Sequence, residues 1–275
     1  MKKHETEELE LELLLQAINS RYGHSFHDYA KASMLRRIKK HLDSIKLERI
    51  SDLIPLFLHD QEAFNRFVKD MSVVVTEMFR DPGFFQALRK DVIPILRTYP
   101  FIKIWHAGCA SGQEVYSMAI LLAEEGLLDR CQIYATDFNE HALEMARQGI
   151  YPQSEMEMYE KNYRLAGGKN KITDYCTQRY DSVKFNGKLA ERITFANHNL
   201  VTDGVFGEMN LVLCRNVLIY FNQTLQDRVL ELLLDSLSAL GILSIGRREN
   251  LRFSTINNRL ETINNKERIY RKIGQ

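Results

Sequence analysis

The sequence predicts an α/β protein with a mostly parallel sheet, preceded by an all-helical domain and interrupted by a small inserted β-subdomain. Three observations lead to this class. Apolar residues follow helical spacing through the first part of the 275-residue chain. Short β-branched strands then alternate with amphipathic helices, which is typical of parallel sheets with right-handed crossovers. One segment, residues 151–192, breaks this alternation and is too long for a simple connection.

Residues 1–75 form the predicted all-helical domain. Gly23, Ser51 and Asp60 supply the breaks and caps between its helices. We expect residues 76–90 to link this domain to a second one over residues 91–275. Apolar residues recur at three- and four-residue steps over residues 8–18, 27–42, 51–58 and 61–71.

The second predicted helix, residues 27–42, is strongly basic. Leu35, Ile38 and Leu42 form its apolar stripe, and only Asp28 and Asp43 offset its positive charge. A solvated basic face is the usual explanation for such a run. A docking face for a carboxylate-rich partner is the alternative. The basic side chains are Lys31, Arg36, Arg37, Lys39 and Lys40.

Residues 73–82 connect the two predicted domains. The three valines that open this segment resist helix formation. Pro82, directly after Asp81, suits the first position of a new helix over residues 83–97. Thr76 and Arg80 therefore lie at a junction between domains, where clefts commonly form.

Residues 102–114, IKIWHAGCASGQE, predict a strand, a glycine turn and a helix. The β-branched and aromatic run ends at Gly108, and small residues continue to Gly112. Such a turn presents backbone N–H groups and a helix N-terminus to a ligand at the carboxyl end of the strand. An ordinary tight turn explains the two glycines equally well. The helix that follows carries Val115, Met118, Ala119 and Leu122 on one face.

The rest of the chain continues the alternation. Helices are predicted at residues 139–148 and 223–240, the second capped by Asn222 and closed by Gly241. The inserted segment combines a helix over residues 155–163 with a strand over residues 180–185. The other strands are predicted at residues 131–136, 193–196, 210–214, 242–245 and 268–273.

Composition excludes several classes of protein. At 45% hydrophobic and 27% charged residues, the chain is typical of a globular protein with a sizeable core. A net charge of +1 provides no overall field toward nucleic acid or an anionic membrane. We expect no signal peptide, and the sequence shows no membrane-spanning run, catalytic serine triad, phosphate loop or metal-ligand spacing. The four cysteines form no C-x-x-C pair, so we expect free thiols in the cytosol.

Two carboxylates are candidates for ligand binding. Asp137 ends the second predicted strand, where it could accept hydrogen bonds from a ribose diol, cap the next helix, or do both. Glu114 lies in the first turn of the helix after the glycine turn. It could bind the amino group of a ligand, or it could simply be favoured there by the helix dipole.

Four blocks of the sequence resemble, in the same order, signature blocks of the chemotaxis receptor methyltransferase family, CheR. The resemblance extends over nearly the whole chain. It implies a Rossmann-like methyltransferase that depends on S-adenosylmethionine (SAM). The implied substrates are glutamate side chains on the cytoplasmic helices of chemoreceptors, which become methyl esters. The blocks are VTEMFRDPGFF, WHAGCASGQEVYSMAI, IYATDFNEHALEMARQGIY and LVLCRNVLIYFNQTLQDRVLELLLDSLSALGILSIG.

The resemblance also implies roles for particular residues. Arg36, Arg37 and Lys40 match the helix that contacts the receptor. The inserted segment matches a small β-subdomain that, in some members, docks a pentapeptide at the receptor C-terminus. Cofactor-binding positions are matched by Thr76, Arg80, Gly108, Glu114, Asp137, Asn199, Leu200, Asn216 and Val217.

The implied reaction needs no general base, because a glutamate with a pKa of ~4.3 is already ionised at neutral pH. Holding the carboxylate oxygen, methyl carbon and sulfur in line then becomes the main catalytic task. Arg80 is the first candidate for orienting the carboxylate. Tyr220 is a candidate hydrogen-bond donor, and core packing is the alternative explanation for that tyrosine.

The chain also departs from the family pattern. Val74 occupies a position where the family often has asparagine, and Met78 replaces a phenylalanine. Arg247 and Arg248 stand where the family commonly has His-Ser, adding charge near the carboxyl edge of the sheet. Val74, Arg247 and Arg248 suit an alternative function, a regulatory module that binds SAM or its product S-adenosylhomocysteine without turnover. We expect a monomer that acts on receptors and binds neither nucleic acid nor membrane.

Overall fold

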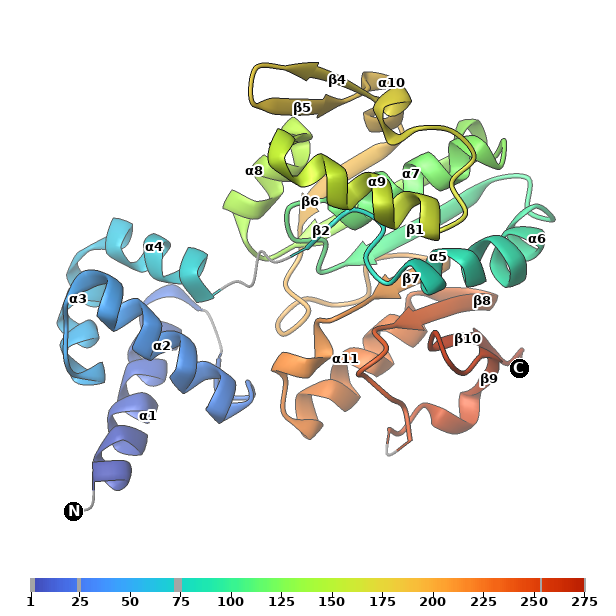
Figure 1. The fold of residues 1–275 in the computed structure, drawn as a ribbon. Coiled ribbons are helices and arrows are strands. Elements are labelled where there is room, and N and C mark those ends of the chain that lie inside the picture. The colour runs from blue at the N-terminus through green and yellow to red at the C-terminus, as the bar shows by residue number, and fades with distance from the viewer. Residues whose placement is uncertain (1–2, 24–25, 72–75, 253, 275) are drawn as a thin grey trace. The chain divides into compact units, whose positions relative to one another are not determined.

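The structure is a computed structural model that describes residues 3–23, 26–71, 76–252 and 254–274. Val74 lies outside these residues. The chain divides into two compact units, shown in Figure 1. The first comprises Met1–Val73 with Ile219–Arg228, and the second comprises Val74–Leu218 with Val229–Gln275.

The first unit is helical and has its own apolar core. Leu14, Ile38, Phe57 and Phe67 are completely buried within it, each from a different helix. Its helices are α1 (Lys3–Tyr22), α2 (Lys31–Ile45), α3 (Leu53–His59) and α4 (Gln61–Met71), together with the beginning of α11 (Gln223–Asp235).

Helix α2 begins four residues later than predicted. The backbone of residues 28–30 pairs with residues 220–222 instead of continuing the helix. Ala30 N donates to Tyr220 O at 2.8 Å, and Asn222 N donates to Asp28 O at 2.8 Å. These bonds satisfy backbone polar groups that a helix would otherwise pair. The amphipathic pattern alone therefore placed the start of α2 too early.

The second unit is built on a seven-stranded, mostly parallel sheet in the order β6-β2-β1-β7-β8-β10-β9. The five strands from β6 to β8 are parallel, and β10 and β9 are antiparallel additions at one edge. The strands are β1 (Ile102–Ala107), β2 (Cys131–Asp137), β6 (Ile193–Asn197), β7 (Met209–Cys214), β8 (Leu237–Ile245), β9 (Leu260–Asn264) and β10 (Ile269–Lys272). The predicted fold class is therefore confirmed.

Helices alternate with these strands along the chain. The helix predicted over residues 83–97 begins at Pro82, as expected, but it is interrupted by a π-turn over Leu88–Val92. Pro94 lies two residues after this turn, and the wider turn accommodates a residue that has no N–H to donate. The helices are α5 (Pro82–Ala87), α6 (Ile93–Leu96), α7 (Gln113–Glu124), α8 (Glu140–Gln148), α9 (Met156–Leu165), α10 (Gly187–Ala190) and the remainder of α11.

The predicted end of the helix over residues 223–240 is wrong. Helix α11 stops at Asp235, and β8 begins at Leu237 opposite Met209 of β7. A register shift in β8 follows, so strand pairing overrides the leucine spacing that suggested a longer helix. Gly241 does not close a helix. A side chain there would approach the Met209 carbonyl at 3.1 Å, so glycine allows the two strands to lie close together.

The inserted segment forms a separate three-stranded antiparallel sheet in the order β3-β5-β4, as the sequence suggested. Its strands are β3 (Ile150–Pro152), β4 (Cys176–Arg179) and β5 (Ser182–Phe185). Glu124 at the end of α7 anchors the segment. Its buried carboxylate accepts hydrogen bonds from Tyr163 and Tyr175 of the insertion and pairs with Arg89.

All four cysteines are free, and Cys109, Cys131 and Cys214 are buried. Within the part of the chain that the structure describes, no helix has the length and apolar character needed to cross a membrane.

Candidate functional site

The loop after β1 is fastened to the end of β2. Gly108 N and Cys109 N both donate to Thr136 O, at 2.8 and 2.9 Å, and Ala110 N donates to Asp137 Oδ2 at 2.9 Å. Gly108 adopts a φ of +83°, and a Cβ there would lie 2.6 Å from Val217 Cγ2. The position therefore requires glycine for its backbone conformation and for close contact with the loop after β7.

Asp137 lies at the carboxyl end of β2, as predicted. Its Oδ1 accepts a hydrogen bond from Asn139 N at 2.9 Å, and its Oδ2 accepts the bond from Ala110. Burial raises the pKa of Asp137, although the backbone amides that donate to the carboxylate oppose this effect. Each oxygen keeps a further lone pair for a ligand hydroxyl.

Asp137 does not cap the following helix. Asn139 performs that role, because its Oδ1 accepts hydrogen bonds from His141 N and Ala142 N at 3.0 and 3.3 Å. The alternative explanation of Asp137 as a helix cap is thus wrong.

Glu114 belongs to a network that the sequence did not reveal. Arg215, directly after β7, pairs with Glu114 Oε2 at 2.6 Å and with Asp81 Oδ2 at 2.9 Å. The Arg215 side chain is only 1% exposed, and its guanidinium lies 3.8 Å from the centre of the Phe84 ring. His106 of β1 approaches Glu114 Oε1 at 3.1 Å through Nδ1.

This network fixes the charge of Glu114. Burial alone would raise the pKa of Glu114, but Arg215 and His106 together lower it to about 2. The carboxylate is therefore ionised at neutral pH and can only accept hydrogen bonds, so His106 Nδ1 must be the donor. By formal count, the carboxylates of Glu114 and Asp81 exceed the single charge of Arg215 by one negative charge.

Arg80 lies in a short segment with unusual backbone geometry. Its neighbours Phe79 and Asp81 both have positive φ values, +52° and +54°. Phe79 N donates to Ser117 Oγ at 2.9 Å, while Asp81 is held by Arg215. Left-handed conformations of this kind persist only where surrounding contacts impose them, and they are concentrated at functional sites.

Glu249 holds together the loops after β7 and β8 and was also missed from the sequence. Its Oε2 accepts hydrogen bonds from Gly246 N at 2.5 Å and from Asn216 N at 3.2 Å. Asn216 itself has a φ of +62°. The neighbouring Arg247 and Arg248 are exposed, and Arg247 pairs with the buried Glu267 at 3.2 Å.

The remaining predicted cofactor residues are Asn199 and Leu200, in the loop after the neighbouring strand β6, and Thr76. Asn199 follows β6, where its side chain accepts a hydrogen bond from Val201 N at 3.0 Å, and Leu200 is buried beside it. Thr76 is partly exposed near the start of the second unit. The structure thus gathers Gly108, Glu114, Asp137, Asn216 and Val217 at the carboxyl ends of the adjacent strands β1, β2 and β7.

The predicted docking residues and Tyr220 belong to the first unit. Arg36 and Lys40 of α2 are exposed, whereas Arg37 is only partly exposed and contacts Tyr220. Part of the positive charge of α2 is neutralised by α1, because Lys39 pairs with Glu7 at 2.9 Å.

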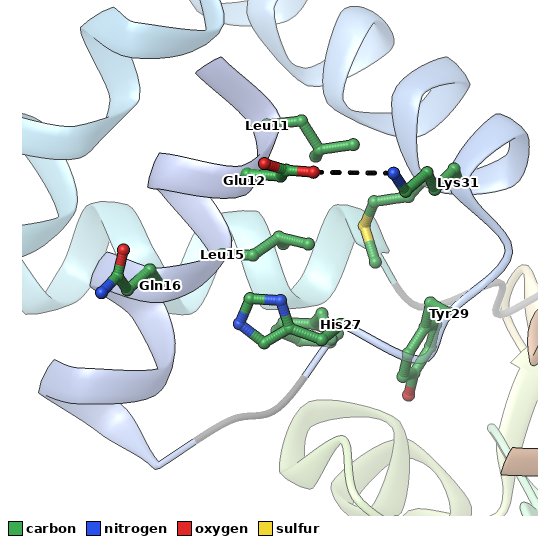
Figure 2. A pocket seen from close by; sticks show the side chains of 9 residues that line it. Leu11, Glu12, Leu15, Gln16, His27, Tyr29 and Lys31 are labelled. Carbon is green, nitrogen blue, oxygen red and sulfur yellow. Dashed lines mark ion pairs between the residues drawn. The ribbon is translucent and has the colours of Figure 1, made fainter. Parts of the chain in front are cut away.

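The first unit also contains a cavity of about 540 Å³ near the beginning of α2. Figure 2 shows its lining and the ion pair between Lys31 and Glu12, whose atoms are 3.7 Å apart. No residue assigned to the cofactor from the sequence lines this cavity. Its lining residues are Leu11, Glu12, Leu15, Gln16, Phe26, His27, Tyr29, Lys31 and Met34.

Comparison with known proteins agrees with this arrangement. Residues 74–269 match the SAM-binding domain of CheR methyltransferases, and residues 9–72 match their all-alpha domain. A putative methyltransferase Cher3 of Pseudomonas putida is 48% identical, covering 96% of this chain and 97% of that protein.

More distant relatives bear the name chemotaxis protein methyltransferase. The protein from Listeria innocua is 28% identical over 86% of this chain and 88% of its own length. The protein from Escherichia coli is 28% identical over 86% of this chain and 82% of its own length. The chain therefore belongs to the CheR methyltransferase family and is a SAM-dependent methyltransferase.

Proposed function

We propose that this methyltransferase acts on glutamate side chains of chemoreceptor cytoplasmic helices and forms glutamyl methyl esters. The observation that carries the proposal is the position of Arg80. It directly precedes Asp81, which shares Arg215 with Glu114. A cation suited to an acceptor carboxylate thus neighbours Asp81 in the chain, and Arg215 joins Asp81 to Glu114, the group suited to the donor's ammonium.

The residues at the sheet edge fit the cofactor chemically. The excess negative charge of the Glu114 network complements the ammonium of the donor's amino-acid end. Asp137 at the end of β2 suits the ribose hydroxyls, as acidic residues do in related nucleotide sites. Gly108, Asn216 and Val217 offer close backbone approach, and Thr76, Asn199 and Leu200 would complete the surroundings. When bound, SAM supplies an electrophilic methyl group on a sulfonium sulfur.

Protein groups then need only orient the acceptor. A glutamate carboxylate is ionised at neutral pH, so no proton has to be removed. Arg80 would hold one carboxylate oxygen while leaving the other directed at the methyl carbon. We expect catalysis to come chiefly from positioning of this kind.

The exposed basic residues of α2 support a receptor partner. Arg36 and Lys40 project into solvent and could steer a helix rich in glutamates by charge complementarity. The three-stranded inserted sheet would be the place for a receptor's C-terminal peptide. Arg36→Glu combined with Lys40→Glu should therefore reduce receptor methylation and leave SAM affinity unchanged.

Methyl transfer from radiolabelled SAM to receptor cytoplasmic fragments tests the proposal. We expect label on the fragment that brief base treatment releases as methanol, because esters hydrolyse in base whereas methylated amines do not. Label that survives base would contradict the ester assignment. Tight SAM binding with no transfer to any receptor fragment would favour the regulatory module that does not turn over.

A further inference from the structure

His106 is a buried polar residue near the end of the central strand β1. It pairs with Ala135 of β2 on one side and with Leu213 of β7 on the other. Neighbouring strands therefore hold its backbone on both sides. Because strands fix a side chain more precisely than loops do, the imidazole projects from a rigid part of the second unit.

The imidazole has one hydrogen-bond partner among the residues that the structure describes. Its Nδ1 lies 3.1 Å from Glu114 Oε1, whereas its Nε2 is buried without a partner in the described part of the chain. A buried polar group that is left unpaired costs free energy, so an apolar side chain would suit the core better. The bond to Glu114, rather than the stability of the core, thus accounts for a histidine at this position.

Glu114 is the member of this pair that solvent reaches. Its side chain is 18% exposed, whereas those of His106 and Arg215 are 2% and 1% exposed. Each carboxylate oxygen accepts from one of these buried donors, Oε1 from His106 and Oε2 from Arg215. Two donors on different oxygens fix the rotation of the carboxylate, and each oxygen keeps a further lone pair for a ligand.

The two donors differ in the charge that they contribute. Arg215 is a cation shared with Asp81, whereas a neutral imidazole can donate without adding charge. A second cation in place of His106 would cancel the excess negative charge that Glu114 and Asp81 have over Arg215. A histidine can therefore orient the carboxylate and leave its attraction for a cation intact.

We propose that His106 is a positioning residue for the cofactor and holds the Glu114 carboxylate in the orientation that receives the donor's ammonium. This inference rests on the proposed function, in which Glu114 takes that group. Because both carboxylate oxygens are held before the cofactor arrives, the cost of ordering the Glu114 side chain is not incurred on binding. His106 acts through Glu114 and does not itself touch the ligand.

Two ligands separate this role from a structural one. S-adenosylhomocysteine carries the ammonium, and 5′-methylthioadenosine has the same nucleoside thioether with a methyl group in place of the amino-acid chain. Calorimetry gives the Kd of each. We expect His106→Leu to weaken S-adenosylhomocysteine binding roughly two- to tenfold, the range for one lost hydrogen bond, and to leave methylthioadenosine binding unchanged. His106→Asn places an amide nitrogen where Nδ1 stood and should recover most of the affinity.

A matched control removes a similar imidazole from the first unit. His41 is 3% exposed and its Nδ1 lies 2.6 Å from Asp70 Oδ2, so His41→Leu should change the Kd of neither ligand. Equal losses of both ligands in His106→Leu, or an unchanged Kd for S-adenosylhomocysteine, would overturn the inference. Thermal unfolding checks the fold of each variant. If His106→Leu does not fold, His106→Val takes its place, because a β-branched residue suits a strand.

Glu114→Gln distinguishes the inference from the proposed function. If Glu114→Gln selectively weakens S-adenosylhomocysteine binding and adding His106→Leu causes no further loss, His106 acts through Glu114 as proposed. If Glu114→Gln has this effect but His106→Leu alone does not, the positioning role alone is wrong. If Glu114→Gln leaves both Kd values unchanged, the ammonium contact of the proposed function is wrong and the inference falls with it. These measurements use no acceptor, so methyl transfer to receptor fragments judges the proposed substrate separately.

Discussion

Replacing Arg215 by glutamine should destabilise the second unit strongly. The side chain is 1% exposed and is the shared partner of Glu114 and Asp81. The pKa of Glu114 falls from 4.5 to about 2 in the folded protein, with Arg215 as the largest favourable cause. At ~1.4 kcal/mol per pH unit, this corresponds to about 3 kcal/mol of stability at neutral pH. Removing one partner of a buried ion pair typically costs a similar ~3–5 kcal/mol.

Urea unfolding at pH 7 measures this loss. Trp105 is the sole tryptophan of the chain and is buried in β1, so its fluorescence reports on the second unit. Arg147→Gln is the matched control, because its ion pair with Glu140 is largely exposed and should contribute less than about 1 kcal/mol. Equal destabilisation by Arg215→Gln and Arg147→Gln would refute the assigned importance of the buried network.

Three further predictions concern the sheet edge. Asp137→Ala should weaken SAM binding at least tenfold, or about 1.4 kcal/mol, and unchanged affinity by calorimetry would remove Asp137 from the site. Gly108→Ala should cost about 1–3 kcal/mol because of its positive φ and the contact with Val217, whereas Gly204→Ala, with open space around it, should be nearly neutral in the same urea assay. The pKa of Glu114 is lowered in the folded state, so its stabilisation is complete above pH 4.5 and is lost as the pH falls toward about 2. Acid unfolding of Glu114→Gln should lack this component, and an identical pH dependence in both proteins would contradict the assigned pKa.

Local patterns predicted the central part of the fold well. Strand β1, the glycine turn and helix α7 were readable because periodicity and turn residues agree over one short segment. The end of α11 could not be predicted in this way. The leucine spacing suits a longer helix, and only the pairing of β8 with β7 ends the helix at Asp235. Strand β9 was missed because its residues alternate poorly, and only the antiparallel pairing with β10 defines it.

The candidate site was predicted less completely than the fold. Asp137 and Glu114 follow from their positions at a strand end and a helix start. Arg215 could not be assigned a role, because its partner Glu114 lies 101 residues away and the ion pair exists only in the folded chain. Arg37 and Arg36 likewise look identical in sequence, and only burial separates them.

The most direct test of the account is a crystal structure of the protein with S-adenosylhomocysteine. We predict that the ribose hydroxyls contact Asp137 and that the ammonium contacts Glu114, over the carboxyl ends of β1 and β2. A ligand bound elsewhere, with both carboxylates keeping only their contacts within the protein, would contradict it.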